Sequence, residues 1–356
     1  MALNNSGPIS FGGSTVGQSI NLELGVSATA TASINSTEFR TLAGVPSGTI
    51  TLSNFYGKSN FTATGLFAGG YSGSVSARVN WIEKISIAST GNATRFGLLT
   101  SARNALSGLG SATRGVFCGG STPSASTLMD YVTIATDGNA TTFGNLTTSR
   151  YFLASSANST RGVNAGGGEG SGTNVIDYIT IASTGNATNF GNLNVAVTET
   201  CASANSTTMI VYSGFVTSST TTTMQSLTIA TTGNATYFGD SIIAITTPMA
   251  VASSTRGVFG GGYRASIGGY SAQLRYVTIS SAGSALQFGD LTVARGAAGA
   301  CSSDVRGVFG GGEGSSSFIV IDYITIASTG NASSFGDMSP SRYALAGCSN
   351  ASAAVS

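Results

Sequence analysis

The sequence predicts an all-β protein whose main part is a six-bladed β-propeller. Three observations predict this fold: a Phe-Gly pair that recurs at a nearly constant spacing, four strand-like segments in each repeat, and an unusual composition. The sequence of 356 residues includes 50 glycines, and only 8% of all its residues are charged. This composition favours many short strands joined by tight turns, because long amphipathic helices need more Leu, Glu and Lys.

The repeat is defined by phenylalanines that stand about 47 to 50 residues apart, which is the period of solenoids and propellers. They are Phe96, Phe143, Phe190, Phe238, Phe288 and Phe335. Each unit is long enough for four short antiparallel strands, which is the content of one propeller blade. A coil of a parallel β-helix needs only about half this length. The β-helix is therefore the second choice.

The third unit shows the four segments most clearly, at 161–167, 177–183, 186–193 and 197–204. In the second segment Ile179 and Ile181 alternate with smaller residues, which is the period of a strand. A Thr-Gly-Asn or Asp-Gly-Asn turn follows, and we expect its glycine to supply a positive φ.

The fourth segment of each unit is dominated by Ala, Gly, Ser and Cys, as in 152–157, 297–303 and 344–349. Small side chains allow close approach around a propeller axis, so this segment is the predicted innermost strand. The recurring Phe then belongs to the outermost strand, where its ring is expected to pack between neighbouring blades.

The end of the chain predicts how the ring closes. The first unit begins at 64–70 without an inner strand before it, and residues 343–352 follow the last unit as an unused inner strand. We expect this C-terminal strand to complete the first blade, because closure leaves no open sheet edge.

Three segments of the last unit carry a resemblance to a known family. "RGVFGGG" (306–312), "DYITIAS" (322–328) and "NASSFGDMSPSR" (331–342) resemble the Kelch repeat, with Phe in place of the usual Trp. The resemblance implies a Kelch-like propeller over residues 61–356 and implies no particular partner.

Residues 1–60 do not follow the repeat and predict a small separate module. Residues 35–44 read as a short helix with Asn35 as N-cap and Gly44 near its end. Residues 19–25 fit a second short helix or an extended arm, and 47–59 alternate apolar and polar residues. So few large apolar side chains make a weak independent core.

The same module is similar to a known family. Residues 19–59, which end in "NFYGKS", resemble the N-terminal module of tail-fibre and other structural proteins of tailed bacteriophages. This resemblance implies a virion component that docks to other virion proteins through residues 1–60. Such a protein is assembled in the host cytoplasm and exposed on the particle exterior, in multiple copies.

The composition disfavours most catalytic, metal and cofactor chemistry. There is no histidine, and the four cysteines lack C-x-x-C spacing, so we expect no metal, no cofactor and four small buried thiols. The formal net charge of +1 argues against nucleic acid as a partner. No stretch approaches the roughly 20 apolar residues that span a bilayer, and the first residues do not resemble a signal peptide.

The acidic residues repeat between units, which favours a scaffold over an active site. Asp130, Asp177 and Asp322 precede a Tyr, and three further Asp follow Phe-Gly. We expect them to cap turns or to form exposed pairs with the recurring arginines, worth roughly 0 to 1 kcal/mol each. The glycine clusters lack the Lys-Ser/Thr of a phosphate loop and are expected to end strands with a positive φ.

The loops that follow the double glycines differ between units, and in a propeller they gather on one face. Aromatic and arginine side chains on loops suit a glycan or protein surface. The candidate binding residues are Tyr71, Arg78, Trp81, Phe215, Tyr263, Arg264, Tyr270 and Arg275.

These observations predict a non-enzymatic phage virion protein: a tail fibre, tail-tip or adaptor protein whose propeller attaches to a host-surface glycan or protein. Two alternatives remain open. One is a carbohydrate-active enzyme on a propeller scaffold. The other is a purely structural collar or capsid decoration protein.

Overall fold

The computed structural model describes residues 3, 18–24, 36–45, 47, 49–51 and 63–351. The chain divides into two compact units, Met1–Thr62 and Ala63–Ser356. Among the described residues no helix combines the length and the apolar character needed to cross a bilayer.

The N-terminal unit contains two short helices, α1 (Ile20–Glu23) and α2 (Thr37–Ala43). The N-cap of α2 is Ser36, whose hydroxyl accepts a hydrogen bond from the Phe39 amide, so the expectation of Asn35 as N-cap is wrong. Gly44 ends the helix at φ 70°, a conformation that glycine adopts without steric cost. The alternating segment 47–59 lies mostly outside the described residues.

Residues 63–351 form six four-stranded antiparallel sheets, each taken here as a blade and given from its inner to its outer strand. Blade 1 consists of β28 (Ala346–Ser349), β1 (Thr64–Ala68), β4 (Trp81–Ser86) and β5 (Thr94–Leu98). Blade 2 consists of β6 (Ser107–Gly110), β7 (Arg114–Cys118), β8 (Leu128–Thr133) and β9 (Thr141–Asn145). Blade 3 consists of β10 (Ala154–Ala157), β11 (Arg161–Ala165), β12 (Thr173–Thr180) and β13 (Thr188–Val197).

The remaining blades follow the same order. Blade 4 consists of β14 (Cys201–Ala204), β15 (Thr208–Val216), β16 (Ser219–Thr228) and β17 (Thr236–Asp240). Blade 5 consists of β18 (Met249–Ala252), β19 (Arg256–Gly260), β22 (Gln273–Thr278) and β23 (Leu286–Asp290). Blade 6 consists of β24 (Gly299–Ser302), β25 (Arg306–Gly310), β26 (Val320–Thr325) and β27 (Ser333–Asp337).

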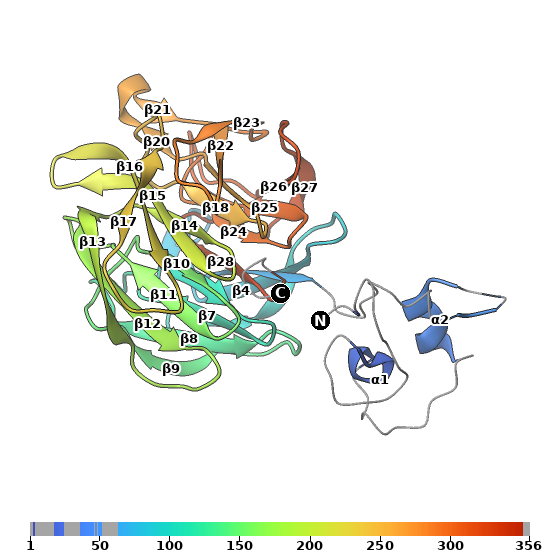
Figure 1. The fold of residues 1–356 in the computed structure, drawn as a ribbon. Helices are drawn as coiled ribbons and strands as arrows, with labels where there is room; N and C mark the ends of the chain where they lie inside the picture. The colour runs from blue at the N-terminus through green and yellow to red at the C-terminus, as the bar shows by residue number, and fades with distance from the viewer. Residues whose placement is uncertain are drawn as a thin grey trace. The chain divides into compact units, whose positions relative to one another are not determined.

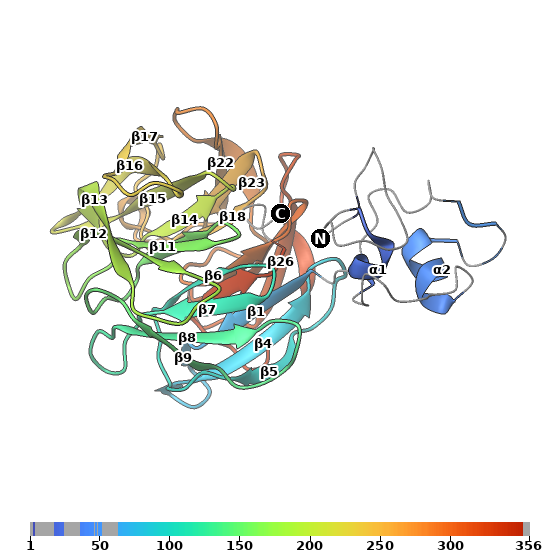
Figure 2. The same ribbon diagram turned by 60° about the horizontal axis from the view of Figure 1, so that its bottom comes forward.

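The six inner strands contact one another in turn around a common axis, so the predicted six-bladed propeller is confirmed. Figures 1 and 2 show the blades following one another around this ring, from the blue strands of blade 1 to the red strands of blade 6. Two blades carry an extra hairpin. They are β2 (Tyr71–Ser72) with β3 (Ala77–Arg78) in blade 1, and β20 (Tyr263–Arg264) with β21 (Gly269–Tyr270) in blade 5, the latter joined by the 3-10 helix η2 (Ala265–Ile267).

The C-terminal strand closes the ring as predicted. β28 pairs with β1 in an antiparallel register that runs from Gly65 opposite Ser349 to Ala68 opposite Ala346. The Asn350 side chain extends the junction, because its Oδ1 accepts a hydrogen bond of 2.8 Å from the Thr64 amide. Neither end of the propeller therefore presents a free inner-strand edge.

The repeated Phe-Gly and Gly-Asn-Ala motifs join neighbouring blades. In the link between blades 2 and 3, Gly185 N donates to the Phe143 carbonyl (2.9 Å), and Asn145 N donates to Asn186 Oδ1 (3.0 Å). The glycine after Phe leaves room for this turn, because a Cβ on Gly144 would clash with the Gly185 carbonyl. The same backbone bond from the turn glycine to the Phe carbonyl joins Gly91 to Phe335, Gly233 to Phe190, Gly283 to Phe238 and Gly330 to Phe288.

The structure corrects one expectation about these glycines and confirms another. The turn glycines do not adopt the positive φ of a hairpin turn: Gly185 lies at φ 159°, close to extended backbone, and Gly138 has no positive φ. The double glycines that follow the second strand of a blade, counted from the axis, do have a positive φ. The values are 69° at Gly311 and 102° at Gly312, after β25.

The recurring Phe rings fill the space between blades, as predicted from the repeat. Phe96 of blade 1 packs with Val132 and Ile134 of blade 2. At the closing junction Phe335 of blade 6 packs with Ile85 and Ile87 of blade 1. A separate apolar cluster therefore lies at each of the six blade junctions, and each buried phenyl ring contributes roughly 1.5–3 kcal/mol.

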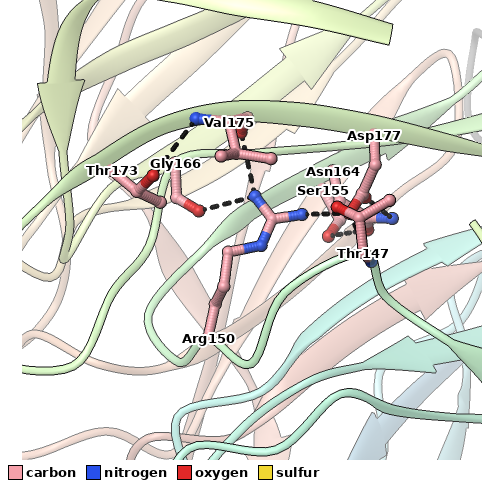
Figure 3. A network of polar contacts seen from close by, with 8 residues as sticks. All are labelled: Thr147, Arg150, Ser155, Asn164, Gly166, Thr173, Val175 and Asp177. Atoms are coloured by element: carbon pink, nitrogen blue, oxygen red, sulfur yellow. Dashed lines mark hydrogen bonds and ion pairs between the residues drawn. The ribbon is translucent and has the colours of Figure 1, made fainter. Parts of the chain in front are cut away.

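The recurring arginines before the inner strands form buried ion pairs, here called staples. Arg150 donates to Asp177 (2.6 Å) and to the carbonyls of Gly166 and Val175 (2.9 Å each), with Thr147 also bound to Asp177, as Figure 3 shows. The equivalent pairs are Arg103–Asp130, Arg295–Asp322 and Arg342–Glu83. All four arginine side chains are at most 1% exposed, so the expectation of exposed pairs is wrong.

Blades 4 and 5 lack this staple. In blade 4, Gln225 replaces the acidic residue of the staple, and its side-chain amide is hydrogen-bonded to the backbone of Val195. In blade 5, Arg275 replaces the acidic residue; it is 7% exposed and donates to Gln273 Oε1 (3.0 Å). Ile245 of blade 5 stands where blades 1, 2, 3 and 6 have the staple arginine. The sheet geometry is preserved, while the charge pattern is not.

Candidate functional site at the propeller axis

Two sets of loops meet on one face of the propeller, here called the loop face. One set crosses from the outer strand of a blade to the inner strand of the next, and the other follows the double glycines. Short backbone bridges tie the two sets together in blades 1, 2, 4, 5 and 6. The bridged pairs are Tyr71–Tyr343, Asn104–Ser121, Thr198–Phe215, Thr246–Tyr263 and Gly296–Glu313.

At the centre of this face six residues form a ring, here called the axial ring. Its members are Ala344, Ala105, Phe152, Glu199, Thr247 and Ala297, one from each blade, all with φ between 51° and 54°. Backbone hydrogen bonds of 2.7–3.5 Å run around the whole ring. They join Ala105 N to Ala344 O, Phe152 N to Ala105 O, Thr200 N to Phe152 O, Thr247 N to Glu199 O, Ala297 N to Thr247 O and Ala344 N to Ala297 O.

The left-handed backbone of these residues costs of order 1–2 kcal/mol at each position, and the closed hydrogen-bond ring holds it in place. The axial ring forms the mouth of a cavity of about 160 Å³ that runs between the six inner strands. Small residues line the cavity, including Ser107, Ser156, Ala202, Ala250 and Ala300. The small side chains of the inner strands, which the sequence predicted, thus leave a cavity along the propeller axis.

One member of the axial ring breaks its symmetry. Glu199 is the single charged residue among the six positions and among all residues that line the cavity. Burial raises the pKa of Glu199, and the nearby charge of Glu313 raises it further, while a hydrogen bond from Thr246 acts in the opposite direction. A carboxyl group that holds its proton more strongly than usual therefore stands at the cavity mouth.

Tyrosines surround the second carboxylate, Glu313. Burial raises the pKa of the Tyr270 phenol, and the nearby Glu313 carboxylate raises it further. Tyr343 lies close enough for Glu313 to raise the pKa of its phenol, after the larger effect of burial. The ring centroids of Tyr71 and Tyr343 are 5.4 Å apart, and those of Tyr263 and Tyr270 are 5.5 Å apart. We call the group Tyr71, Glu199, Tyr263, Tyr270, Glu313 and Tyr343 the tyrosine–glutamate cluster.

The two extra hairpins explain why the cluster occupies one sector of the face. β2–β3 carries Tyr71, and β20–β21 carries Tyr263 and Tyr270. These hairpins belong to blades 1 and 5, on either side of blade 6, which supplies Glu313. In Figure 1 the hairpin β20–β21 stands out from the body of the propeller. The hairpins that depart from the repeat thus supply three of the four tyrosines of the cluster.

Five of the residues predicted from sequence lie in or beside the cluster. Tyr71, Tyr263 and Tyr270 belong to it. Arg78 is the register partner of Tyr71 and donates to Asn104 Oδ1 (3.0 Å) and Ser121 Oγ (3.3 Å). Arg264 follows Tyr263, and its Nε donates to Ser266 Oγ (2.9 Å).

The other three predicted residues lie within the blades. Trp81 begins β4, and its carbonyl accepts a hydrogen bond from Arg342 (3.0 Å). Phe215 is a half-buried residue of β15 that pairs with Thr198. The placement of Arg275 in an exposed loop is wrong, because it is buried in β22.

Sequence reasoning missed Glu199, Glu313 and Tyr343. A usable signal was present for Glu199, which replaces the Ala, Phe or Thr found at the equivalent position of the other repeats. Glu313 and Tyr343 had no such signal, because their proximity depends on how the loop after the double glycine of blade 6 packs against the loop that crosses from blade 6 to blade 1.

The fold and the site define a closed six-bladed β-propeller with an asymmetric polar and aromatic cluster at one mouth of its axial cavity. Neither a known protein family nor a curated protein matches the sequence. Among solved structures, the structure of YjhT is similar, with a TM-score of 0.59 and 10% sequence identity. The similarity covers 70% of this chain and 88% of YjhT, and at this identity it supports the fold alone.

Proposed function

We propose that this chain is a non-enzymatic bacteriophage virion protein whose propeller binds a saccharide on the host surface. The observation that carries the binding role is the tyrosine–glutamate cluster at the cavity mouth. Residues 1–60 join the protein to other virion proteins, and their resemblance to the N-terminal module of phage structural proteins supports that part. The protein then stands in multiple copies on the particle exterior, where weak contacts add up.

The chemistry of the cluster supports a saccharide ligand. Aromatic rings present flat apolar surfaces that pack against the C–H face of a sugar, and carboxylates accept hydrogen bonds from its hydroxyl groups. Tyrosine supplies large contact area at low conformational-entropy cost, because its side chain has two rotatable angles. A concave site with a few convergent polar groups is typical of small-ligand recognition.

Binding of the full chain to an array of bacterial surface polysaccharides tests the proposal. We expect Tyr71→Ala and Tyr343→Ala to weaken binding at least about tenfold each, as loss of an aromatic anchor does. The matched control is Tyr237→Ala, because Tyr237 is 58% exposed on the outer strand β17, away from the cluster. Equal binding by all variants would overturn the assignment of the site.

The docking role has its own test. A protein that lacks residues 1–60 should keep a folded propeller and no longer join particles, as assayed by sedimentation of assembled virions. Incorporation at the level of the full chain would contradict the docking role and leave the saccharide site untouched.

A second candidate function is a carbohydrate-active enzyme, favoured by the paired carboxyl groups of Glu199 and Glu313. Burial raises the pKa of Glu199, so this residue has the character of a general acid, and Glu313 would be the base. Assay of polysaccharides for new reducing ends separates the two functions. Turnover that is lost in Glu199→Gln would establish the enzyme and exclude the non-enzymatic role.

A further inference from the structure

We propose that the tyrosine–glutamate cluster selects a saccharide that carries a positively charged amine. This inference rests on the proposed saccharide-binding function and specifies the chemical class of its ligand. Four features of the described residues carry it: two carboxylates without a cationic partner, arginines that are engaged elsewhere, tyrosine rings without a cation above them, and a cavity mouth with a single charged residue.

Glu199 and Glu313 differ from the fully buried carboxylates of the propeller. Asp130, Asp177 and Asp322 are each paired with a staple arginine. Glu199 and Glu313 take part in none of the ion pairs found among the described residues, and the groups that act on them are the neutral hydroxyls of Thr246 and Tyr270. The cluster therefore has uncompensated negative charge in a partly desolvated place, where an opposite charge interacts most strongly.

The arginines near the cluster do not neutralise this charge. Arg78 is held by Asn104 and Ser121 on the side of blade 2, and Arg264 is held by Ser266 within its own hairpin. Arg295 and Arg342, in the adjacent crossing loops, are buried and paired with their own acids. A ligand is thus left to supply the positive charge.

The tyrosine rings point to the same kind of ligand. Elsewhere in the propeller four tyrosines each have an arginine guanidinium 4.3–4.6 Å from the ring centroid. Among the described residues no guanidinium lies over Tyr71, Tyr263, Tyr270 or Tyr343 in this way. Electron-rich rings beside carboxylates are the usual receptor for an ammonium group, at about 0.5–2 kcal/mol per ring.

The cavity behind the cluster supplies space and polarity. Glu199 is its single charged lining residue, and the rest of the lining consists of small polar and apolar residues. An amine-bearing substituent that enters the mouth therefore meets the Glu199 carboxylate. An N-acetyl substituent of the same sugar brings no charge to offset the burial of Glu199.

The test compares two oligosaccharides that differ only in charge. A glucosamine trimer and its fully N-acetylated counterpart are titrated into the full chain by calorimetry near neutral pH, at low and at high salt. We expect the glucosamine trimer to bind at least about tenfold more tightly, with Kd of about 1 mM or lower. Added salt should reduce this preference, because it screens partly exposed charges.

Variants assign the effect to the two carboxylates. Glu199→Gln and Glu313→Gln should each lower affinity for the glucosamine trimer and leave binding of the N-acetylated trimer unchanged. Glu169→Gln, which removes an exposed carboxylate from the loop of blade 3, is the matched control and should bind like the parent chain. Thermal unfolding of each variant checks that the fold is intact.

The outcomes separate this inference from the function on which it rests. Equal binding of both trimers that depends on Tyr71 and Tyr343 overturns the selection for an amine and retains the saccharide site. Binding of neither trimer, or unchanged binding by both Gln variants, also overturns the selection, while the polysaccharide array decides the general function. Competition by Ca²⁺ alone, with no preference between trimers, would replace the amine by a metal ion.

Discussion

Arg342 and Glu83 lie 259 residues apart in the sequence and form a buried ion pair where the last crossing loop meets blade 1. Arg342 also donates to the carbonyls of Gly69 (2.9 Å) and Trp81 (3.0 Å). The staple that stabilises blades 2, 3 and 6 internally thus also fastens the ends of the propeller to each other.

Removing one partner of this closing staple should be costly. Glu83→Ala leaves a buried guanidinium without its counter-charge, and we expect the free energy of unfolding to fall by about 3–5 kcal/mol. Urea unfolding measures the loss. The neighbouring Lys84→Ala is the control, because Lys84 pairs with Asp137 at an exposed position and should cost less than about 1 kcal/mol. Similar losses for both variants would contradict the role of the staple.

Blade 5 offers the opposite experiment, because its staple is absent. Arg275 faces Phe259 in the same register in which Asp130 faces Phe117, and Ile245 occupies the position of the arginine. Ile245→Arg alone adds a second buried cation, and Arg275→Asp alone buries an unpaired acid, so each should destabilise the fold. The double variant should recover about 1–3 kcal/mol relative to the sum of the two, in a double-mutant cycle of unfolding free energies. Additive effects would show that the two positions do not meet.

The link between blades can be tested at two glycines of one contact. A Cβ on Gly97 would clash with the carbonyl of Gly138, whereas a Cβ on Gly138 has nothing within 4 Å. Gly97→Ala should therefore destabilise the propeller by about 1–3 kcal/mol, as overpacking does. Gly138→Ala should stay within about 0.5 kcal/mol of the parent chain. Chemical denaturation compares the two, and equal effects would exclude the steric explanation.

Stability should depend on pH through Glu199. Its pKa is raised in the folded state, so the folded protein binds its proton more tightly than the unfolded chain does. Ionising this carboxyl group in the folded protein lowers the free energy of unfolding. This loss is absent at pH below the ordinary glutamate pKa of about 4.3, and it develops as the pH rises through the higher pKa of the folded state. Glu199→Gln should raise the thermal midpoint at neutral pH and have little effect at the acidic end. A variant that stabilises equally at both ends would contradict this assignment.

Sequence patterns predicted the propeller well because each of its features is local and repeated. Phe143 and its equivalents mark the outer strands, and the small residues of 344–349 mark the inner strand that closes the ring. The burial of the staples was not predictable in this way. Arg150 and Asp177 are separated by two strands, and their exposure depends on how the crossing loop covers them.

The candidate site was only partly predictable for the same reason. Tyr71, Tyr263 and Tyr270 were found because they lie in loops that vary between repeats. Glu199 differs from the Ala, Phe or Thr of the equivalent positions, but Tyr343 has no such signal, and only the packing of the crossing loops around the axis brings the two residues together. Arg275 was misplaced because the variable loop was predicted to extend to the residue before Tyr276, whereas β22 already begins at Gln273.

The order in which the blades are completed follows from the pairing of β28 with β1. During synthesis β1 emerges early, and its inner edge remains exposed until Ala346–Ser349 leave the ribosome. The nascent propeller therefore has an unpaired strand edge for most of its translation. Two copies close together can then pair the final strand of one chain with β1 of the other. Swapped dimers should accordingly be the characteristic misassembly of this chain at high expression.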